Sequence, residues 1–119
     1  MKILLVEDVA DLRRLFARVL VGHGYDVREA SEGGEALETL AAFEPAVILT
    51  DLMMPGLDGF ELLRRVSLMP EMSDVPVVVM SAAANGEFEK QARVAGAADV
   101  LAKPFDSRTL VGRLEGVLR

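Results

Sequence analysis

The 119-residue chain contains no cysteine and no tryptophan, and it has one tyrosine and one histidine, His23. The absence of cysteine excludes a disulfide framework and a thiolate metal site. His23 stands between glycines, where we expect an exposed helix end rather than a reactive group. Zinc and copper sites depend on sulfur or imidazole ligands and are therefore a poor fit.

Positive charge is scarce, because 13 Lys and Arg residues face 19 Asp and Glu residues and the formal net charge is −6. Proteins that bind nucleic acids draw much of their affinity from Lys and Arg contacts to phosphates. Arg13, Arg14 and Arg18 recur at helical spacing, and we interpret them as a solvated helix face. Direct binding to nucleic acid is not expected.

Long hydrophobic runs are also missing. No run approaches the roughly 18 residues that a membrane-spanning helix needs. The apolar run Ile3–Val6 is too short for a signal peptide. A chain of 119 residues fits one domain of ordinary size. The sequence therefore predicts one cytoplasmic domain, residues 1–119, without membrane contact.

Five short apolar segments alternate with five amphipathic segments along the chain. The apolar segments are Ile3–Val6, Val27–Ala30, Ala46–Thr50, Val75–Ser81 and Asp99–Ala102. Four of them are nearly continuous apolar runs, which is typical of parallel strands covered on both faces. Val27 has the polar neighbours Asp26 and Arg28, so its segment is predicted to lie near an edge of the sheet.

The amphipathic segments carry apolar residues at helical spacing and have recognisable ends. Glycines at 22, 24 and 96 are typical of helix C-termini. The candidate N-caps are Ser31 or Glu32, Asp58, Asn85, and Asp106 or Ser107. Alternating strands and helices predict an α/β fold with a doubly wound, five-stranded parallel sheet and helices on both faces.

Polar side chains end or directly follow four of the five predicted strands. They are Glu7 and Asp8, Asp51, Ser81 and Lys103. The second strand ends at Ala30 and Ser31 and adds no residue to this set. Open parallel sheets bind their ligands at the carboxyl ends of the strands, so we expect this set to share one rim.

The chemistry of this set favours Mg²⁺ and a phosphoryl group. Three neighbouring carboxylates repel one another unless a cation neutralises them. Mg²⁺ is a hard ion that prefers oxygen ligands and often binds together with a phosphate. Lys103 offers a point charge and Ser81 a hydroxyl donor for phosphoryl oxygens. An aspartate such as Asp51 can itself attack phosphorus to form an aspartyl phosphate.

Four motifs carry a resemblance to a known family. They are Glu7-Asp8 after ILLV, the segment TDLMMPGLDG at 50–59, Met80-Ser81-Ala82, and Lys103-Pro104-Phe105. With these motifs in order, the chain resembles the receiver domain of bacterial two-component response regulators, including chemotaxis regulators, over nearly its whole length. The resemblance implies a flavodoxin-like fold with strand order 2-1-3-4-5. It also implies a phosphorylation switch that assists its own phosphorylation and dephosphorylation, and not an enzyme with separate substrates.

The resemblance assigns a role to each residue of the rim. Asp51 is similar to the phosphoacceptor, and Ser81 and Lys103 to the residues that contact phosphoryl oxygens. Glu7, Asp8, Asp51 and the backbone carbonyl of Met53 are similar to the Mg²⁺ ligands. The peptide bond between Lys103 and Pro104 is similar to the family's cis peptide.

The resemblance also implies partners. The phosphoryl donor would be a sensor histidine kinase or a histidine phosphotransfer protein, and a downstream output domain or protein would respond. Phosphorylation would change the surface around the fourth helix, the fifth strand and the fifth helix, with a homodimer as one outcome. The family usually has Tyr or Phe three residues before the lysine, where this chain has Val100. Valine cannot make the large inward swing of that aromatic side chain. At this position the chain therefore departs from the usual output mechanism.

Other functions fit the sequence less well. A haloacid-dehalogenase-like phosphatase expects a second catalytic Asp two residues after the first, where this chain has Met53. A flavin or nucleotide module expects a Gly- or Ser/Thr-rich loop after the first strand, where residues 7–11 read EDVAD. A pseudo-receiver that only docks partners predicts loss of the acids, which are present. A stand-alone regulator and the receiver of a longer protein both remain open.

Overall fold

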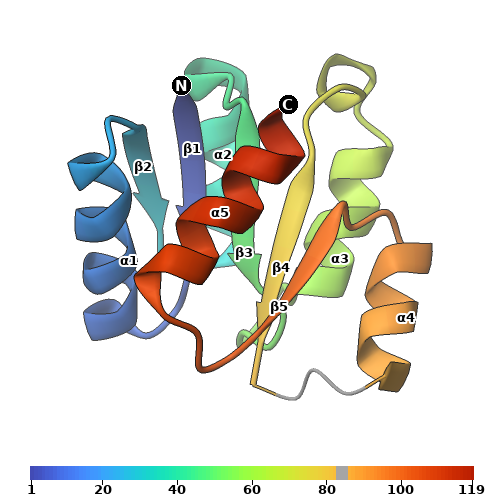
Figure 1. Cartoon of the computed structure of the whole chain (residues 1–119). Coiled ribbons are helices and arrows are strands. Elements are labelled where there is room, and N and C mark those ends of the chain that lie inside the picture. Colours follow the sequence, from blue (N-terminus) through green and yellow to red (C-terminus); the bar gives the residue numbers. More distant parts are fainter. Residues whose placement is uncertain (83–85) are drawn as a thin grey trace.

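The computed structural model describes residues 1–82 and 86–119, which form a five-stranded parallel sheet between two layers of helices (Figure 1). The strands are β1 (Lys2–Val6), β2 (Asp26–Ala30), β3 (Val47–Asp51), β4 (Val77–Ser81) and β5 (Asp99–Ala102). They are ordered β2-β1-β3-β4-β5, which confirms both the predicted fold class and the strand order implied by the resemblance.

Several strand boundaries differ from the sequence prediction by one or two residues: β1 and β2 each begin one residue earlier than predicted, and β3 begins one residue later. Asp51 is the last residue of β3 and pairs in register with Met80 of β4, whereas the prediction ended the third strand one residue earlier. The prediction also began the fourth strand at Val75, but β4 begins at Val77. A 3₁₀ helix, η1 (Pro70–Met72), precedes this strand, and the Val75 amide donates to the carbonyl of Met72 rather than to the sheet.

Five α-helices connect the strands. They are α1 (Ala10–Gly22), α2 (Gly33–Phe43), α3 (Gly59–Ser67), α4 (Gly86–Val94) and α5 (Ser107–Leu118). Figure 1 shows α5 crossing in front of the sheet while α2 lies behind it. Each helix stands where the amphipathic pattern predicts one.

The two faces of the sheet carry separate apolar cores. One core packs residues of α1 and α5, such as Phe16 and Leu110, against Ile3 and Leu5 of β1. The other core includes residues of α2, α3 and α4, and Leu4 of β1 belongs to it. Neighbouring strand residues point to opposite faces, so a strand covered on both sides must be apolar throughout. This explains the continuous apolar runs in the sequence.

Local signals fix most helix ends. The side chains of Glu32, Asp58 and Asp106 each accept a hydrogen bond from the backbone amide three residues later, which settles the cap alternatives at α2 and α5. The predicted cap Asn85 lies outside the described residues. At Gly24 and Gly96 the backbone has φ of 91° and 115°, a conformation that glycine adopts without strain. No helix in the described part of the chain is long and apolar enough to cross a membrane.

Candidate functional site

The carboxyl ends of four strands bring the predicted site residues to one edge of the sheet. Glu7 and Asp8 follow β1, Asp51 ends β3, Ser81 ends β4, and Lys103 follows β5. Lys103 and Glu7 are 96 positions apart in the sequence, and their side chains form a hydrogen bond here. We call this set of five residues the carboxyl rim.

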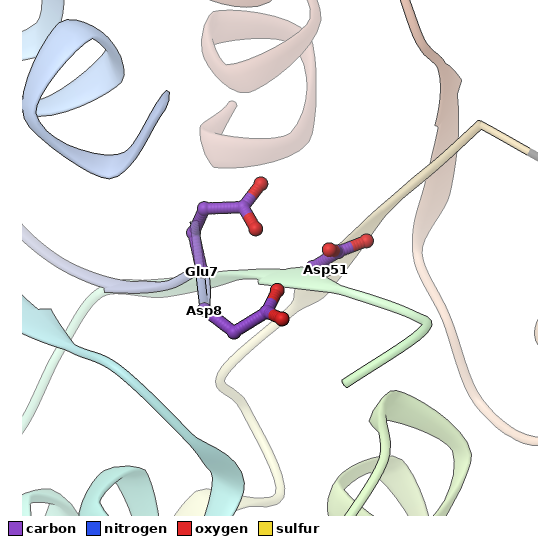
Figure 2. Close-up of side chains that lie close together, drawn as sticks. All are labelled: Glu7, Asp8 and Asp51. Carbon is purple, nitrogen blue, oxygen red and sulfur yellow. The ribbon is translucent and has the colours of Figure 1, made fainter. Parts of the chain in front are cut away.

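Three carboxylates of the carboxyl rim lie close together. Glu7, Asp8 and Asp51 each offer an oxygen within 4.8 Å of the other two. Figure 2 shows the side chains of Glu7 and Asp8 leaving the end of β1 and converging with Asp51 at the end of β3. Glu7 is fully buried, Asp51 is 6% exposed and Asp8 is half-buried. Such closely spaced negative charges favour a bound cation.

Lys103 supplies a positive charge to this group. Its Nζ lies 2.6 Å from Oε1 of Glu7 and 3.4 Å from Oδ2 of Asp51. The backbone amide of Lys103 donates to the carbonyl of Ser81, which ties the end of β5 to the end of β4. The peptide bond from Lys103 to Pro104 is cis, as the resemblance implied.

The β1–α1 turn is held by several hydrogen bonds around Glu7. The Glu7 amide donates to the carbonyl of Ala30 at the end of β2, and the Val9 amide donates to the Glu7 carboxylate over 3.3 Å. Arg13 of α1 donates to the carbonyl of Glu7 over 2.9 Å and pairs with Glu29 of β2. The interpretation of Arg13 as part of a solvated face is therefore wrong, since its side chain is only 16% exposed. The second strand adds no side chain to the carboxyl rim, but the pairing of its Glu29 with Arg13 was not predicted.

The turn after Asp51 depends on a glycine that sequence reasoning did not single out. The Gly59 amide donates to the carbonyl of Leu52 over 2.8 Å. A Cβ at Gly59 would lie 2.6 Å from the carbonyl oxygen of Asp51 and from the Cα of Leu52. Any larger residue would therefore push the start of α3 away from the phosphoacceptor candidate. Its place in the TDLMMPGLDG motif was the available signal.

Ser81 and Met53 lie at or just beyond the carboxyl ends of β4 and β3. Ser81 is fully buried at the end of β4, one residue beyond the register pair of Asp51 and Met80. Met53 follows Asp51 by two residues and is 60% exposed. Their proposed contacts to a phosphoryl group and to Mg²⁺ remain predictions.

A second group of charges lies at the opposite end of β5. Asp99 accepts two hydrogen bonds of 2.6 Å from Arg113 of α5 and a further one of 3.2 Å from Arg93 of α4. The hydrogen bonds from Arg113 lower the pKa of Asp99, and burial opposes part of that effect. The same contact raises the pKa of Arg113. We call Asp99, Arg93 and Arg113 the arginine cluster.

The donor atoms of the carboxyl rim suit one kind of chemistry. All three acids offer oxygen, which matches a hard divalent cation such as Mg²⁺. The lysine ammonium beside Asp51 is placed to neutralise negative charge at that carboxylate. The rim therefore gathers three carboxylates and one ammonium group, a donor set that suits a hard divalent cation.

Comparisons with known proteins find one family along nearly the whole chain. The family described as "Response regulator receiver domain" matches residues 3–115. The chain is 37% identical over 117 residues to the phosphate regulon transcriptional regulatory protein PhoB of Pseudomonas aeruginosa, covering 98% of this chain and 51% of that protein. It is also 37% identical over 119 residues to the response regulator MprA of Mycobacterium avium, covering 100% of this chain and 51% of that protein. The chain thus spans about half the length of these curated relatives.

Solved structures show the same fold. The chemotaxis protein CheY4 of Vibrio cholerae superimposes with a TM-score of 0.93 at 30% identity, covering 98% of this chain and 97% of that one. The receiver domain of the Francisella response regulator 1452 gives a TM-score of 0.91 at 29% identity, covering 98% and 95%. The similarity therefore extends over nearly the whole of each chain.

Proposed function

This chain belongs to the response regulator receiver-domain family, and on that premise we propose that it is a phosphorylation-dependent switch whose phosphoacceptor is Asp51. Receiver domains are switch domains and not classical enzymes. The observation that carries the proposal is the convergence of the Glu7, Asp8 and Asp51 carboxylates within 4.8 Å of one another. Lys103 Nζ lies 3.4 Å from Asp51.

The phosphoryl donor in this proposal is a phosphohistidine on a sensor histidine kinase or a histidine phosphotransfer protein. A carboxylate oxygen of Asp51 attacks phosphorus, the bond from phosphorus to the donor imidazole breaks, and the released imidazole takes up a proton. Lys103 and the hydroxyl of Ser81 then contact phosphoryl oxygens, where a positive charge and a donor stabilise the developing negative charge. The same residues assist the later hydrolysis of the aspartyl phosphate.

Members of this family bind Mg²⁺ at an acidic pocket, and we propose that the carboxyl rim does so here. Glu7, Asp8, Asp51 and the backbone carbonyl of Met53 would hold the ion. The fit rests on donor chemistry, because three carboxylate oxygens gather in a chain that has no cysteine. When bound, Mg²⁺ neutralises the acids and the phosphoryl oxygens, while the chain's own residues position the nucleophile.

The output of the switch is proposed to be a change in the surface formed by α4, β5 and α5. Val100 of β5 is 6% exposed and belongs to the core that also includes Ala92 of α4. Since valine has no ring to swing, the change would have to travel through the backbone that carries Ser81 and Lys103. A downstream output domain or protein, or a homodimer formed on phosphorylation, would respond to the changed surface in the cytoplasm.

The test is phosphorylation by a small acyl-phosphate donor in the presence of Mg²⁺, followed by intact-mass analysis. The wild-type protein gains one phosphoryl group, and Asp51→Asn gains none while keeping its circular dichroism spectrum. Asp58→Asn is the matched control, because Asp58 caps α3 through the Glu61 amide and asparagine caps helices equally well. A phosphoryl adduct on Asp51→Asn, or its loss from Asp58→Asn alone, would contradict the proposal.

A further inference from the structure

Arg13 connects three segments beside the carboxyl rim. From the first turn of α1, its Nη1 donates to the backbone carbonyl of Glu7 over 2.9 Å. Its Nε donates to Oε1 of Glu29, near the end of β2, over 3.2 Å. Glu29 pairs in register with Leu5, two residues before Glu7. The arginine therefore links α1 and β2 to the turn that carries two of the three rim carboxylates.

The carbonyl that Arg13 contacts belongs to a critical peptide unit. The carbonyl of Glu7 and the amide of Asp8 lie in the same plane, because the peptide bond is planar. A hydrogen bond that fixes this carbonyl therefore fixes the plane that joins the two acidic residues. The Glu7 amide is held separately by the carbonyl of Ala30, so the backbone of Glu7 is restrained on both sides.

The geometry points to Arg13 as a positioning residue for the metal-binding acids, with Glu29 orienting its guanidinium; this inference rests on the proposed Mg²⁺ function. Arg13 does not touch the rim carboxylates through any contact described above. It acts through the Glu7–Asp8 peptide plane, which sets the direction in which the Asp8 side chain leaves the backbone. Glu29 is 41% exposed, and its part is to hold the planar fork of Arg13 in one orientation.

An electrostatic role and a positioning role for Arg13 predict opposite changes in Mg²⁺ affinity when its side chain is removed. A cation near the carboxyl rim repels a divalent ion, so removing the charge of Arg13 would strengthen Mg²⁺ binding if electrostatics dominated. If positioning dominates, the same change weakens Mg²⁺ binding. Lysine at this position keeps the charge but lacks the fork that reaches two acceptors at once. Arg13→Lys therefore separates geometry from charge.

The experiment is an NMR titration of backbone amides with MgCl₂. We expect Arg13→Met to raise the dissociation constant for Mg²⁺ by about 10-fold, as the loss of outer-shell partners typically does. Arg13→Lys should give an intermediate loss. Arg14→Met is the matched control, because Arg14 is 70% exposed and pairs with Asp11 away from the turn. It should leave the dissociation constant within about twofold of the wild type, since a surface charge has little effect.

Glu29 is tested in combination with Arg13. If it acts only by orienting the arginine, adding Glu29→Gln to Arg13→Met weakens Mg²⁺ binding no further. An unchanged or tighter dissociation constant for Arg13→Met would overturn the inference. So would an equal loss in Arg14→Met.

The same spectra separate this inference from the proposed function. Without Mg²⁺, Arg13→Met should shift the amide signals of Asp8 and Val9, because the peptide plane before them loses its restraint. If the wild type binds no Mg²⁺, the proposed function fails, and these metal-free signals then decide the role of Arg13. Unchanged signals would overturn the positioning role, and shifted signals that Arg14→Met lacks would support it.

Discussion

The carboxyl rim and the arginine cluster stand at opposite ends of the same sheet and balance their charges differently. In the rim, the carboxylates of Glu7, Asp8 and Asp51 lie close together, and the ammonium of Lys103 contacts Glu7 and Asp51. In the arginine cluster, the one carboxylate of Asp99 receives hydrogen bonds from two guanidinium groups and from the Val100 amide. The rim has an excess of negative charge, whereas the charges of the arginine cluster are balanced, because Arg93 also pairs with Glu89 over 3.2 Å.

This difference separates a group of side chains that can bind a cation from a group that joins α4, β5 and α5 to one another. The carboxylate of Asp99 is fully engaged within the chain, and its lowered pKa records that stabilisation. The rim carboxylates repel one another, so a divalent cation can relieve a strain that the chain leaves in place. An excess of buried acid is thus a better indicator of function here than the number of ion pairs.

Removing one cation from each group should show the largest contrast. Lys103→Met leaves the fully buried Glu7 without its 2.6 Å partner, and we expect a loss of about 3 kcal/mol in unfolding free energy, at the lower end for a broken buried pair. Arg113→Met should cost only about 1 kcal/mol, because Arg113 is 44% exposed and Asp99 keeps Arg93. Urea unfolding without Mg²⁺, followed by circular dichroism because the chain has no Trp, measures both.

Equal losses in these two variants would break the comparison, since they would mean that Glu7 finds another partner. The m-value of each variant serves as the control. A constant m-value shows that the change lies in stability and not in the denatured state.

Neutralising one carboxylate in each group should give effects of opposite sign. Without Mg²⁺, Asp8→Asn relieves repulsion in the rim and should raise the unfolding free energy by on the order of 1 kcal/mol. Asp99→Asn removes the negative charge and one of the two acceptor oxygens that face the arginines, and it should lower the unfolding free energy. Urea unfolding in a chelating buffer measures the sign of each change.

Mg²⁺ should reverse the order of stability of the wild type and Asp8→Asn. A ligand at 100 times its dissociation constant stabilises the folded state by about 2.7 kcal/mol, so the wild type should melt higher with saturating Mg²⁺. Asp8→Asn should gain less, and Asp99→Asn should gain as much as the wild type. Equal melting temperatures of the wild type with and without Mg²⁺ would show that the rim does not bind the ion.

The sequence allowed prediction of the features that depend on near neighbours. The caps at Asp58 and Asp106 were found because a capping side chain and its amide lie three residues apart. The convergence of Asp51 with Asp8 followed from the polarity of parallel strands, which places all their carboxyl ends at one edge. The order of the strands came from the family resemblance and not from the hydrophobic pattern.

Features that depend on register and close approach could not be found in this way. Arg13 has the spacing of a solvated helix position, and its partner Glu29 stands 16 residues away on another element. Only the register of β2 against β1 brings the two together. The need for glycine at position 59 likewise depends on how closely α3 approaches the backbone of Asp51.

The smallest expected effect is a pH dependence confined to the arginine cluster. The pKa of Asp99 is lowered in the folded protein, mainly by the hydrogen bonds from Arg113. A lowered folded pKa contributes stability above the unfolded value of about 3.9, and that stability is lost as the pH falls through the folded pKa. The difference in unfolding free energy between the wild type and Asp99→Asn should therefore be largest near neutral pH and shrink below about pH 4.

Other acids titrate in both proteins and cancel in the difference, so urea unfolding across this range isolates Asp99. A difference that stays constant down to pH 3 would mean that protonation of Asp99 does not change the stability of the folded protein. The ion pairs of Asp99 would then contribute no measurable stability, and the comparison would depend on the rim alone.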